Sequence, residues 1–265
     1  MGVSTASNNG IRSALLHRSI KKTRLLNSLY EALRHHFAPL YKKNPLVIYQ
    51  MGKVGSETVE RSLACHDLQR PVFRVHSLVE EHINAGLSGA GVSFEDYRQR
   101  SLHAENGLYL AKEVARYLHR GHWQVITMVR DPVAQNVSSF FQLIDLFIPN
   151  FVAREQAGEL SAAELMDVFL QHYTPDSNFI NWFDVEMKPS FAIDVFASEF
   201  SKDDGYKIYR EPHAELLLMR LEDVDRCAPT AFREFLNMND FQIVKQNEAK
   251  AKKYYQLYKK FKTEA

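Results

Sequence analysis

The sequence predicts an α/β protein with a central, mainly parallel sheet of about five strands, flanked by helices in three layers. Short apolar runs alternate along the chain with segments of helical composition, a pattern typical of parallel βαβ units. Two of these runs end in turns that lead directly into helices, so both turns should lie at the carboxyl edge of the sheet. The predicted strands are 46–50, 72–76, 124–129, 207–210 and 216–221.

Helices should fill most of the gaps between these strands. The sequence shows no internal repeat and no low-complexity tract that would interrupt the alternation. The glycine-rich stretch 86–91 is predicted to be a flexible loop and a candidate lid over a site at the sheet edge. The predicted helices are 104–119, 133–144, 162–172, 230–236 and 249–261.

Length and composition are those of a globular protein. The chain has 265 residues, of which 45% are hydrophobic, and can bury a sizeable core in one α/β domain. No run approaches the roughly 20 apolar residues that span a bilayer, and the N-terminus lacks the apolar core of a signal peptide. Cys65 and Cys227 offer neither a disulfide framework nor a metal spacing, so we expect a cytoplasmic protein.

Basic charge is concentrated in the first 43 residues. This leader holds eight Lys or Arg and a single acid, Glu31, so it carries +7 and leaves −6 for the rest of a chain whose net charge is +1. We therefore predict two parts, a basic N-terminal helical extension over 1–43 and an α/β domain over 44–265. The leader also repeats apolar residues at helical spacing, at Leu26, Leu29, Leu33 and Phe37.

Two interpretations of the leader stand side by side. A basic amphipathic helix suits peripheral contact with the anionic inner face of a membrane, which we expect in preference to contact with nucleic acid. A helix that packs on the domain and leaves its basic face in solvent explains the same pattern.

The segment QMGKVGSETVERSL, residues 50–63, places a lysine in a glycine-containing turn between a strand and a helix. The first backbone N–H groups of a helix have no intrahelical partner and lie at the positive end of its dipole, so an anion binds there. Lys53 would add a full positive charge. In the loop of ATPases and GTPases the lysine directly precedes the hydroxyl residue that holds magnesium, whereas here Lys53 precedes Gly55 by two positions.

A second candidate anion site follows the strand at 124–129. Arg130 stands at the strand end, and Pro132 suits the first turn of the next helix, where a missing N–H costs nothing. Ser138 then lies two turns along that helix. An arginine fork and a hydroxyl group on neighbouring elements can hold one phosphate. The alternative is a surface arginine that pairs with Asp131.

With these two motifs the chain resembles the sulfotransferases that use 3′-phosphoadenosine 5′-phosphosulfate (PAPS), and most nearly the bacterial capsular polysaccharide synthesis (sulfotransferase-like) proteins. The resemblance runs from about Pro45 to the C-terminus and implies a P-loop-like α/β fold. Besides the lysine loop it rests on RDPVAQNVSSFF, NFINWFDVEMKP, LLLMRLEDVD and NEAKAKKYYQLYKKFK.

The resemblance also implies roles for individual residues. The 5′-phosphosulfate would be held by the loop and the helix start, and the 3′-phosphate by Arg130 and Ser138. Glu57 departs from the pattern, since many members have a small hydroxyl residue there; its carboxylate should point away from the anion and favour the helix dipole. The implied residues of the phosphosulfate loop are Lys53, Val54, Gly55, Ser56, Glu57 and Thr58.

Sulfuryl transfer also needs a base for the acceptor hydroxyl. His76 ends the second predicted strand and should face the same sheet edge as Lys53, and an imidazole titrates near neutral pH. The alternative bases are Glu80, Glu57 and His103. We expect no metal, because the His, Cys and acidic residues show no cluster at ligand spacing.

An aromatic and acidic cluster near residue 182 has two interpretations. Trp182, Phe183 and Asp184, with Phe179 nearby, could stack on a sugar ring and bond its hydroxyl groups. Aromatic clusters are more often part of a core, so Asp184 and Glu186 are not candidate catalytic residues.

The predicted activity is transfer of the sulfuryl group of PAPS to a hydroxyl acceptor, leaving adenosine 3′,5′-bisphosphate. Lys53 would stabilise the leaving group and His76 would act as base in an in-line transfer. The expected acceptor is a bacterial surface polysaccharide or another glycan. Two alternatives stay open: a nucleotide-dependent phosphotransferase or NTPase of the same architecture, and a non-catalytic nucleotide-fold module recruited through its basic N-terminal helix.

Overall fold

The computed structural model describes residues 39–87, 94–172, 180–244 and 252–264, and of these the side chains of 86, 87, 94–102 and 264 are left aside. The chain divides into two units, Met1–Lys43 and Asn44–Ala265. In the first unit the described part is Pro39 and a short 3₁₀ helix, η1 (Leu40–Lys43). The rest of the predicted basic helix over 1–43 lies outside the described residues.

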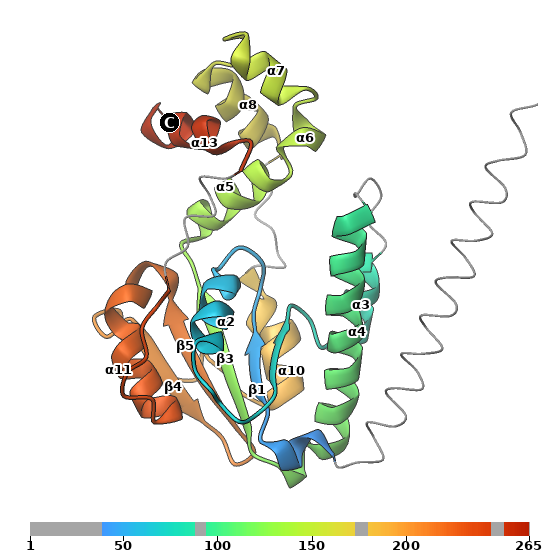
Figure 1. Ribbon diagram of the computed structural model, residues 1–265, viewed down its shortest axis with the longest axis vertical. Helices are drawn as coiled ribbons and strands as arrows, with labels where there is room; N and C mark the ends of the chain where they lie inside the picture. The colour runs from blue at the N-terminus through green and yellow to red at the C-terminus, as the bar shows by residue number, and fades with distance from the viewer. Residues whose placement is uncertain (1–38, 88–93, 173–179, 245–251, 265) are drawn as a thin grey trace, which may run out of the picture. The chain divides into compact units, whose positions relative to one another are not determined.

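The second unit is built on one five-stranded sheet with the order β2-β1-β3-β5-β4 (Figure 1). Its first four members run parallel, and β4 pairs antiparallel with β5. This confirms the predicted α/β class and the mainly parallel sheet. The strands are β1 (Leu46–Tyr49), β2 (Val72–Val75), β3 (Trp123–Val129), β4 (Tyr206–Arg210) and β5 (Ala214–Arg220).

The central strands are apolar on both faces because helices cover both faces of the sheet. All four residues of β1 have no exposed surface. On one face, the amide of Gln124 donates to the carbonyl of Phe235 in α11 (Val224–Leu236) at 3.2 Å. On the other, the rings of Tyr49 and Trp123 lie 6.0 and 6.2 Å from that of Phe191 in α10 (Lys188–Phe191). Figure 1 shows α10 behind the sheet and α11 in front.

Helices occupy most of the connections, and several boundaries differ from the prediction. The long helix begins at Phe94 instead of 104, and the helix predicted from 230 begins at Val224 and contains Pro229. The other helices are α2 (Ser56–Ala64), α3 (Glu80–Leu87), α4 (Phe94–Tyr117), η2 (Leu118–Arg120), α5 (Pro132–Gln142), α6 (Ile144–Phe147), α7 (Phe151–Gln156), α8 (Ala162–His172), the π-helix η3 (Phe183–Met187), η4 (Leu221–Asp223) and α13 (Tyr255–Glu264).

Two further predictions concern segments that lie partly outside the described residues. The loop predicted over 86–91 is wrong at its start, because α3 continues to Leu87, and its residues 88–91 lie outside the described part. The terminal helix predicted over 249–261 begins at Tyr255, and its residues 249–251 lie outside the described part as well.

A second core packs helices α5 to α8 against α13. Phe140 and Phe141 of α5 meet Phe261 of α13 at ring distances of 6.5 and 5.4 Å, and Phe169 of α8 lies 5.7 Å from Phe261. These rings are buried. The C-terminal helix therefore contacts the helix that follows β3, although 113 or more residues separate them. No helix in the described part of the chain is both long and apolar enough to cross a membrane.

Replacing Phe141 should show how much this second core stabilises the domain. Its ring has no exposed surface and contacts Tyr258 as well as Phe261. We expect Phe141→Ala to lower the free energy of unfolding by about 3–5 kcal/mol, from lost burial and the cavity left behind. Urea denaturation measures this, with Leu146→Ala as the control because Leu146 of α6 is 61% exposed. Equal effects of the two substitutions would contradict the described packing.

Candidate functional site: an anion-binding edge

The turn between β1 and α2 depends on residues with a left-handed backbone. Lys53 has φ of 66° and Gly55 has φ of 90°, and Gly55 is the N-cap of α2. A β-carbon at position 55 would lie 2.8 Å from Cδ1 of Leu221 and 3.2 Å from Cε of Met128. Only glycine combines this φ with such close neighbours. The helix therefore begins close against the sheet, with the N–H groups of its first turn at the sheet edge.

Two side chains from the neighbouring motif hold the carbonyl groups of this turn. Nε2 of Gln135 donates to the carbonyl of Gly52 at 2.7 Å, and Nη1 of Arg130 donates to the carbonyl of Lys53 at 3.1 Å. Arg130 follows β3 and Gln135 lies in α5, so the two predicted anion motifs meet at one edge.

The side chain of Lys53 is partly enclosed at this edge. Its Nζ donates to Oε1 of Gln142, at the end of α5, at 2.6 Å. Burial lowers the pKa of Lys53, and the charges of Lys252 and Arg130 lower it further, while Glu57 acts in the opposite direction. Three cations thus converge here from distant parts of the sequence. An anion would relieve their mutual repulsion.

The two acids nearest in sequence to Lys53 and Arg130, Glu57 and Asp131, bond to other groups. The carboxylate of Glu57 is exposed and pairs with Arg61 one turn along α2, at 3.0 Å. Asp131 accepts from the N–H of Ala134 at 2.8 Å, which makes it the N-cap of α5. Arg130 has no ion-pair partner in the described part of the chain, so the alternative pairing with Asp131 is absent there.

The remaining predicted nucleotide residues lie at the start of α2 and about two turns along α5. Val54 is buried in the turn, while Ser56 and Thr58 are half-buried in α2. The hydroxyl of Ser56 accepts from Nη1 of Arg74 at 3.4 Å, and the N–H of Thr58 donates to the carbonyl of Gly55 at 3.1 Å. Ser138 is half-buried in α5.

The turn between β1 and α2, residues 50–55, is the lysine turn. His76 follows β2 and contacts the start of this turn. Its Nδ1 lies 3.0 Å from the carbonyl of Gln50, so Nδ1 carries the proton and donates it. This tautomer leaves the lone pair on Nε2. Surrounding protein atoms lower the pKa of His76 although its side chain is exposed, and the backbone hydrogen bond opposes this shift. The ring is therefore neutral at pH 7 and able to accept a proton.

The alternative bases lie on α2, α3 and α4. The ring of His103 lies 5.8 Å from that of His76, and its pKa is lowered by burial and then by the charge of Arg74. Glu80 begins α3, and Glu57 pairs with Arg61.

The side chain of Gln50 is a feature that the sequence did not reveal. Gln50 has no exposed surface, and neither amide atom has a hydrogen-bond partner in the described structure. Its backbone is fully engaged, since its N–H donates to the carbonyl of Val75 and its carbonyl accepts from His76. Leaving a buried amide unpaired costs about 1–3 kcal/mol. The unpaired amide of Gln50 therefore makes the start of the lysine turn less stable than its burial alone would suggest.

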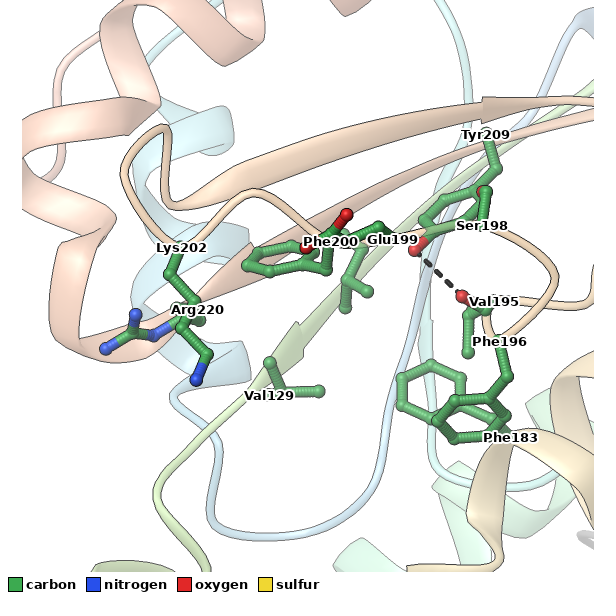
Figure 2. Close-up of a pocket in the computed structure, with 11 residues that line it drawn as sticks. Val129, Phe183, Val195, Phe196, Ser198, Glu199, Phe200, Lys202, Tyr209 and Arg220 are labelled. Carbon is green, nitrogen blue, oxygen red and sulfur yellow. Dashed lines mark hydrogen bonds between the residues drawn. The ribbon is translucent and has the colours of Figure 1, made fainter.

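A cavity of about 550 Å³ opens on the face of the sheet opposite α2, where β3, β4 and β5 meet the connection from α10 to β4 (Figure 2). Its lining is mostly apolar and aromatic, with two basic residues. The lining residues are Val129, Phe183, Val195, Phe196, Ser198, Glu199, Phe200, Lys202, Tyr209, Leu218 and Arg220.

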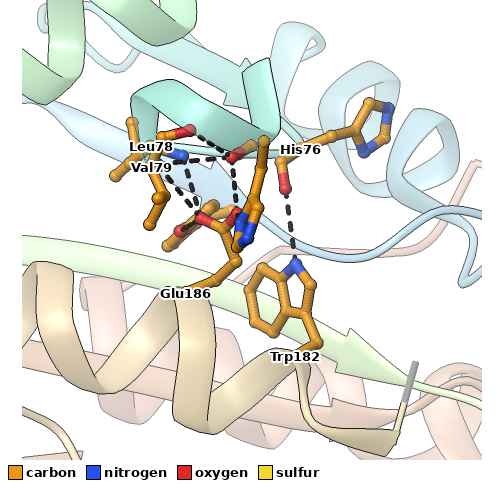
Figure 3. A network of polar contacts seen from close by, with 8 residues as sticks. His76, Leu78, Val79, Trp182 and Glu186 are labelled. Carbon is orange, nitrogen blue, oxygen red and sulfur yellow. Dashed lines mark hydrogen bonds and ion pairs between the residues drawn. The ribbon is translucent and has the colours of Figure 1, made fainter. Parts of the chain in front are cut away.

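A buried carboxylate, Glu186, holds the segment that follows His76 (Figure 3). It accepts from the backbone N–H groups of Leu78 and Val79 at 3.0 and 3.3 Å. Side chains complete the group: the hydroxyls of Tyr49 and Ser77 and Nδ1 of His82 all contact it. Glu186 is only 2% exposed. It lies in the π-helix η3, an arrangement often found at functional sites, and sequence reasoning missed it.

The two aromatic residues beside Glu186 are largely buried, and Phe183 also lines the cavity. Trp182 and Phe183 are each 6% exposed, and the ring of Trp182 lies 4.7 Å from that of Tyr49. The indole N–H of Trp182 donates to the carbonyl of His76 at 3.4 Å. Asp184 is exposed, and Phe179 lies outside the described residues. Trp182 thus supports the segment that carries His76 instead of forming an open sugar platform.

No group of three or more His, Cys, Asp or Glu side chains in the described residues is arranged to hold a metal ion.

The Glu186 network consists of Glu186 and the five residues that bond to it, Tyr49, Ser77, Leu78, Val79 and His82. The effect of Glu186→Gln on stability should show how much this network contributes. An amide offers one acceptor oxygen in place of two and turns two donors toward groups that already donate. We expect the free energy of unfolding to fall by about 2–4 kcal/mol. Denaturation by urea tests this, and the matched control is Asp184→Asn, because Asp184 is an exposed residue of the same π-helix. A loss no larger than that of the control would show that the network contributes little.

Comparison with known proteins gives one match. Residues 161–264 match a family model described as "Putative capsular polysaccharide synthesis protein". The matched part contains Glu186, β4, β5 and every lining residue of the cavity except Val129, whereas Lys53, His76, Arg130 and Ser138 precede it. No curated protein and no solved structure gives a significant match to the chain.

Proposed function

We propose that this protein is a PAPS-dependent sulfotransferase that sulfates a hydroxyl group of a glycan. The observation that carries this proposal is the convergence of Lys53 and Arg130 at one sheet edge, where Arg130 itself shapes the lysine turn. A helix N-terminus and two cations that form no ion pair with any described acid suit a ligand with two separate phosphate-type groups.

The residues at this edge fit a nucleotide of that kind. Lys53 and the N–H groups at the start of α2 would hold the 5′-phosphosulfate, and Arg130 with Ser138 would hold the 3′-phosphate. Lys252 adds a further positive charge near Lys53. The pairing of the Glu57 carboxylate with Arg61 offsets part of its repulsion toward the anion.

PAPS supplies an activated sulfuryl group, whose bond to the bridging oxygen breaks as the bond from the acceptor oxygen to sulfur forms. Lys53 would then neutralise charge on that bridging oxygen after leaving Gln142. His76 would take the hydroxyl proton of the acceptor on Nε2, since Nδ1 already donates to the carbonyl of Gln50. The Glu186 network and Trp182 would keep His76 in place for this transfer.

Nucleotide binding is the first test of the proposal. We expect the protein to bind adenosine 3′,5′-bisphosphate at least about tenfold more tightly than AMP, because only the former engages Arg130 through a second phosphate. Lys53→Ala and Arg130→Ala should each weaken binding by about tenfold to a hundredfold, measured by calorimetry. Lys259→Ala is the control, because Lys259 is exposed in α13.

Two outcomes would count against PAPS as the co-substrate. One is binding of adenosine 3′,5′-bisphosphate no tighter than binding of AMP. The other is a magnesium-dependent affinity for ATP that exceeds the affinity for PAPS, which would favour a phosphotransferase or NTPase instead.

Substitution of His76 should separate catalysis from nucleotide binding. We expect His76→Ala to lower the rate of sulfuryl transfer by about 10²–10⁴-fold, the usual contribution of a general base, and to leave affinity for adenosine 3′,5′-bisphosphate unchanged. Because its pKa is lowered, His76 should lose its basic form only as the pH falls below its ordinary value of about 6.5. The acidic limb of the rate profile should therefore lie below that pH and disappear in the variant. An unchanged turnover rate would assign the base elsewhere.

A further inference from the structure

We propose that the cavity beside β5 binds an acidic sugar residue of the acceptor glycan. This inference rests on the proposed function, because it names the class of acceptor that the enzyme would take. Three features carry it: the chemistry of the lining, the fixed loop that forms one wall, and the place of the cavity next to the anion-binding edge.

The lining combines aromatic rings with positive charge (Figure 2). Phe183, Phe196, Phe200 and Tyr209 contribute rings, and Lys202 and Arg220 contribute the charges. In Figure 2 the two basic residues lie on one side of the cavity and Phe183 and Phe196 on the other. A ligand with an apolar face and an anionic substituent matches both sides. A pyranose ring with a carboxylate has these two features, since its C–H groups pack on aromatic rings.

The positive charge of the cavity is not cancelled by its surroundings. Arg220 lies 3.2 Å from Asp223, but the same carboxylate also pairs with Arg226 at 3.0 Å. Lys202 is exposed and has no ion-pair partner in the described residues. Glu199 is the acidic residue among those that line the cavity. The two cations and this one acid leave a net positive lining, which favours an acidic sugar over a neutral one.

Phe196 is an exposed ring on a fixed turn. Its ring is 66% exposed and stands edge-on to Phe183 at 6.1 Å. Its N–H donates to Oδ1 of Asp194 at 3.0 Å, and Lys188 holds the other oxygen of that carboxylate at 2.6 Å. An exposed aromatic side chain gains stability when a ligand covers it. These hydrogen bonds hold Phe196 in the same position before a ligand binds.

The rest of the cavity wall is tied to β4. The hydroxyl of Tyr209 donates to the carbonyl of Val195 at 3.1 Å. Nζ of Lys207 donates to the hydroxyl of Ser198 at 2.7 Å and to the carbonyl of Glu199. A wall fixed at these points keeps the cavity open, and binding then costs little conformational entropy.

The cavity also lies next to the proposed nucleotide site. Val129 and Arg220 line it and face each other in the ladder between β3 and β5. The residue after Val129 is Arg130, which holds the lysine turn. One sugar residue in the cavity would thus lie beside the edge where the sulfuryl group is transferred, and a neighbouring sugar residue of the same glycan could supply the hydroxyl.

Calorimetry of the full chain with defined oligosaccharides tests the proposal. The probes are tetrasaccharides that contain galacturonate, glucuronate or mannuronate, and maltotetraose is the neutral comparison. We expect at least one acidic probe to bind about tenfold more tightly than maltotetraose, a preference that falls as salt is raised. Phe196→Ala should weaken acidic-probe binding about fivefold to tenfold, and Lys202→Met should abolish the preference for acid.

Matched controls are Leu170→Ala, which removes a 58% exposed apolar side chain of α8, and Lys262→Met in α13. The proposal is overturned if no acidic probe binds more tightly than maltotetraose, or if Phe196→Ala and Lys202→Met behave like these controls. Affinity for adenosine 3′,5′-bisphosphate, measured on the same samples, separates the two proposals. Nucleotide binding without glycan binding overturns the glycan site alone, whereas glycan binding without nucleotide binding supports the cavity and counts against the sulfotransferase.

Discussion

Two hydrogen bonds to the backbone of the lysine turn determine the geometry of the candidate site. A lysine with φ of 66° occupies a region that non-glycine residues rarely adopt, at a cost on the order of 1–3 kcal/mol. Such a conformation persists only where neighbouring groups fix it. Here Arg130 and Gln135 hold two successive carbonyl groups, at Lys53 and Gly52. The conformation of the turn therefore depends on groups that follow β3, the strand beside β1.

The Glu186 network fixes the backbone of the segment after β2, which carries His76. In this segment, a buried carboxylate supplies the acceptors that the N–H groups of Leu78 and Val79 need. Because Tyr49 of β1 also donates to Glu186, the network joins the ends of two strands. Burial and the charge of Glu186 raise the pKa of Tyr49, so its hydroxyl keeps its proton and remains a donor. The position of His76 thus depends on a residue 110 positions away in sequence.

Local patterns were sufficient to predict the sheet and the meeting of Lys53 and Arg130 at one of its edges. β1 and β3 are continuous apolar runs, and such runs require burial on both faces. Lys53 and Arg130 follow those runs directly, so parallel topology brings them together. Helix boundaries were less accurate: the helix predicted from Thr230 begins six residues earlier, at Val224, and includes Pro229.

Long-range partners could not be predicted in this way. Glu186 bonds to groups between 104 and 137 residues away, and nothing in its local sequence distinguishes it from an exposed acid such as Asp184. Gln142 gives no local signal either: it accepts from Lys53 across 89 residues of sequence, and the charge of Lys252 acts on Lys53 from the segment before α13. The cavity likewise depends on how the wall from Val195 to Lys202 is tied to β4.

Positive charge at the sheet edge destabilises the folded protein when no ligand is bound. Lys53 is protonated more easily in the unfolded chain than in the folded one, because its folded pKa is lowered by burial and by Lys252 and Arg130. The cost is fully present below the folded pKa of Lys53 and is lost as the pH rises from there toward about 10.5, the unfolded value. An anion removes the same cost at neutral pH by restoring the charge balance around the amine. Any anion that binds the folded state only must therefore stabilise it, and the amine of Lys53 can leave Gln142 for the anion without losing a hydrogen-bond partner.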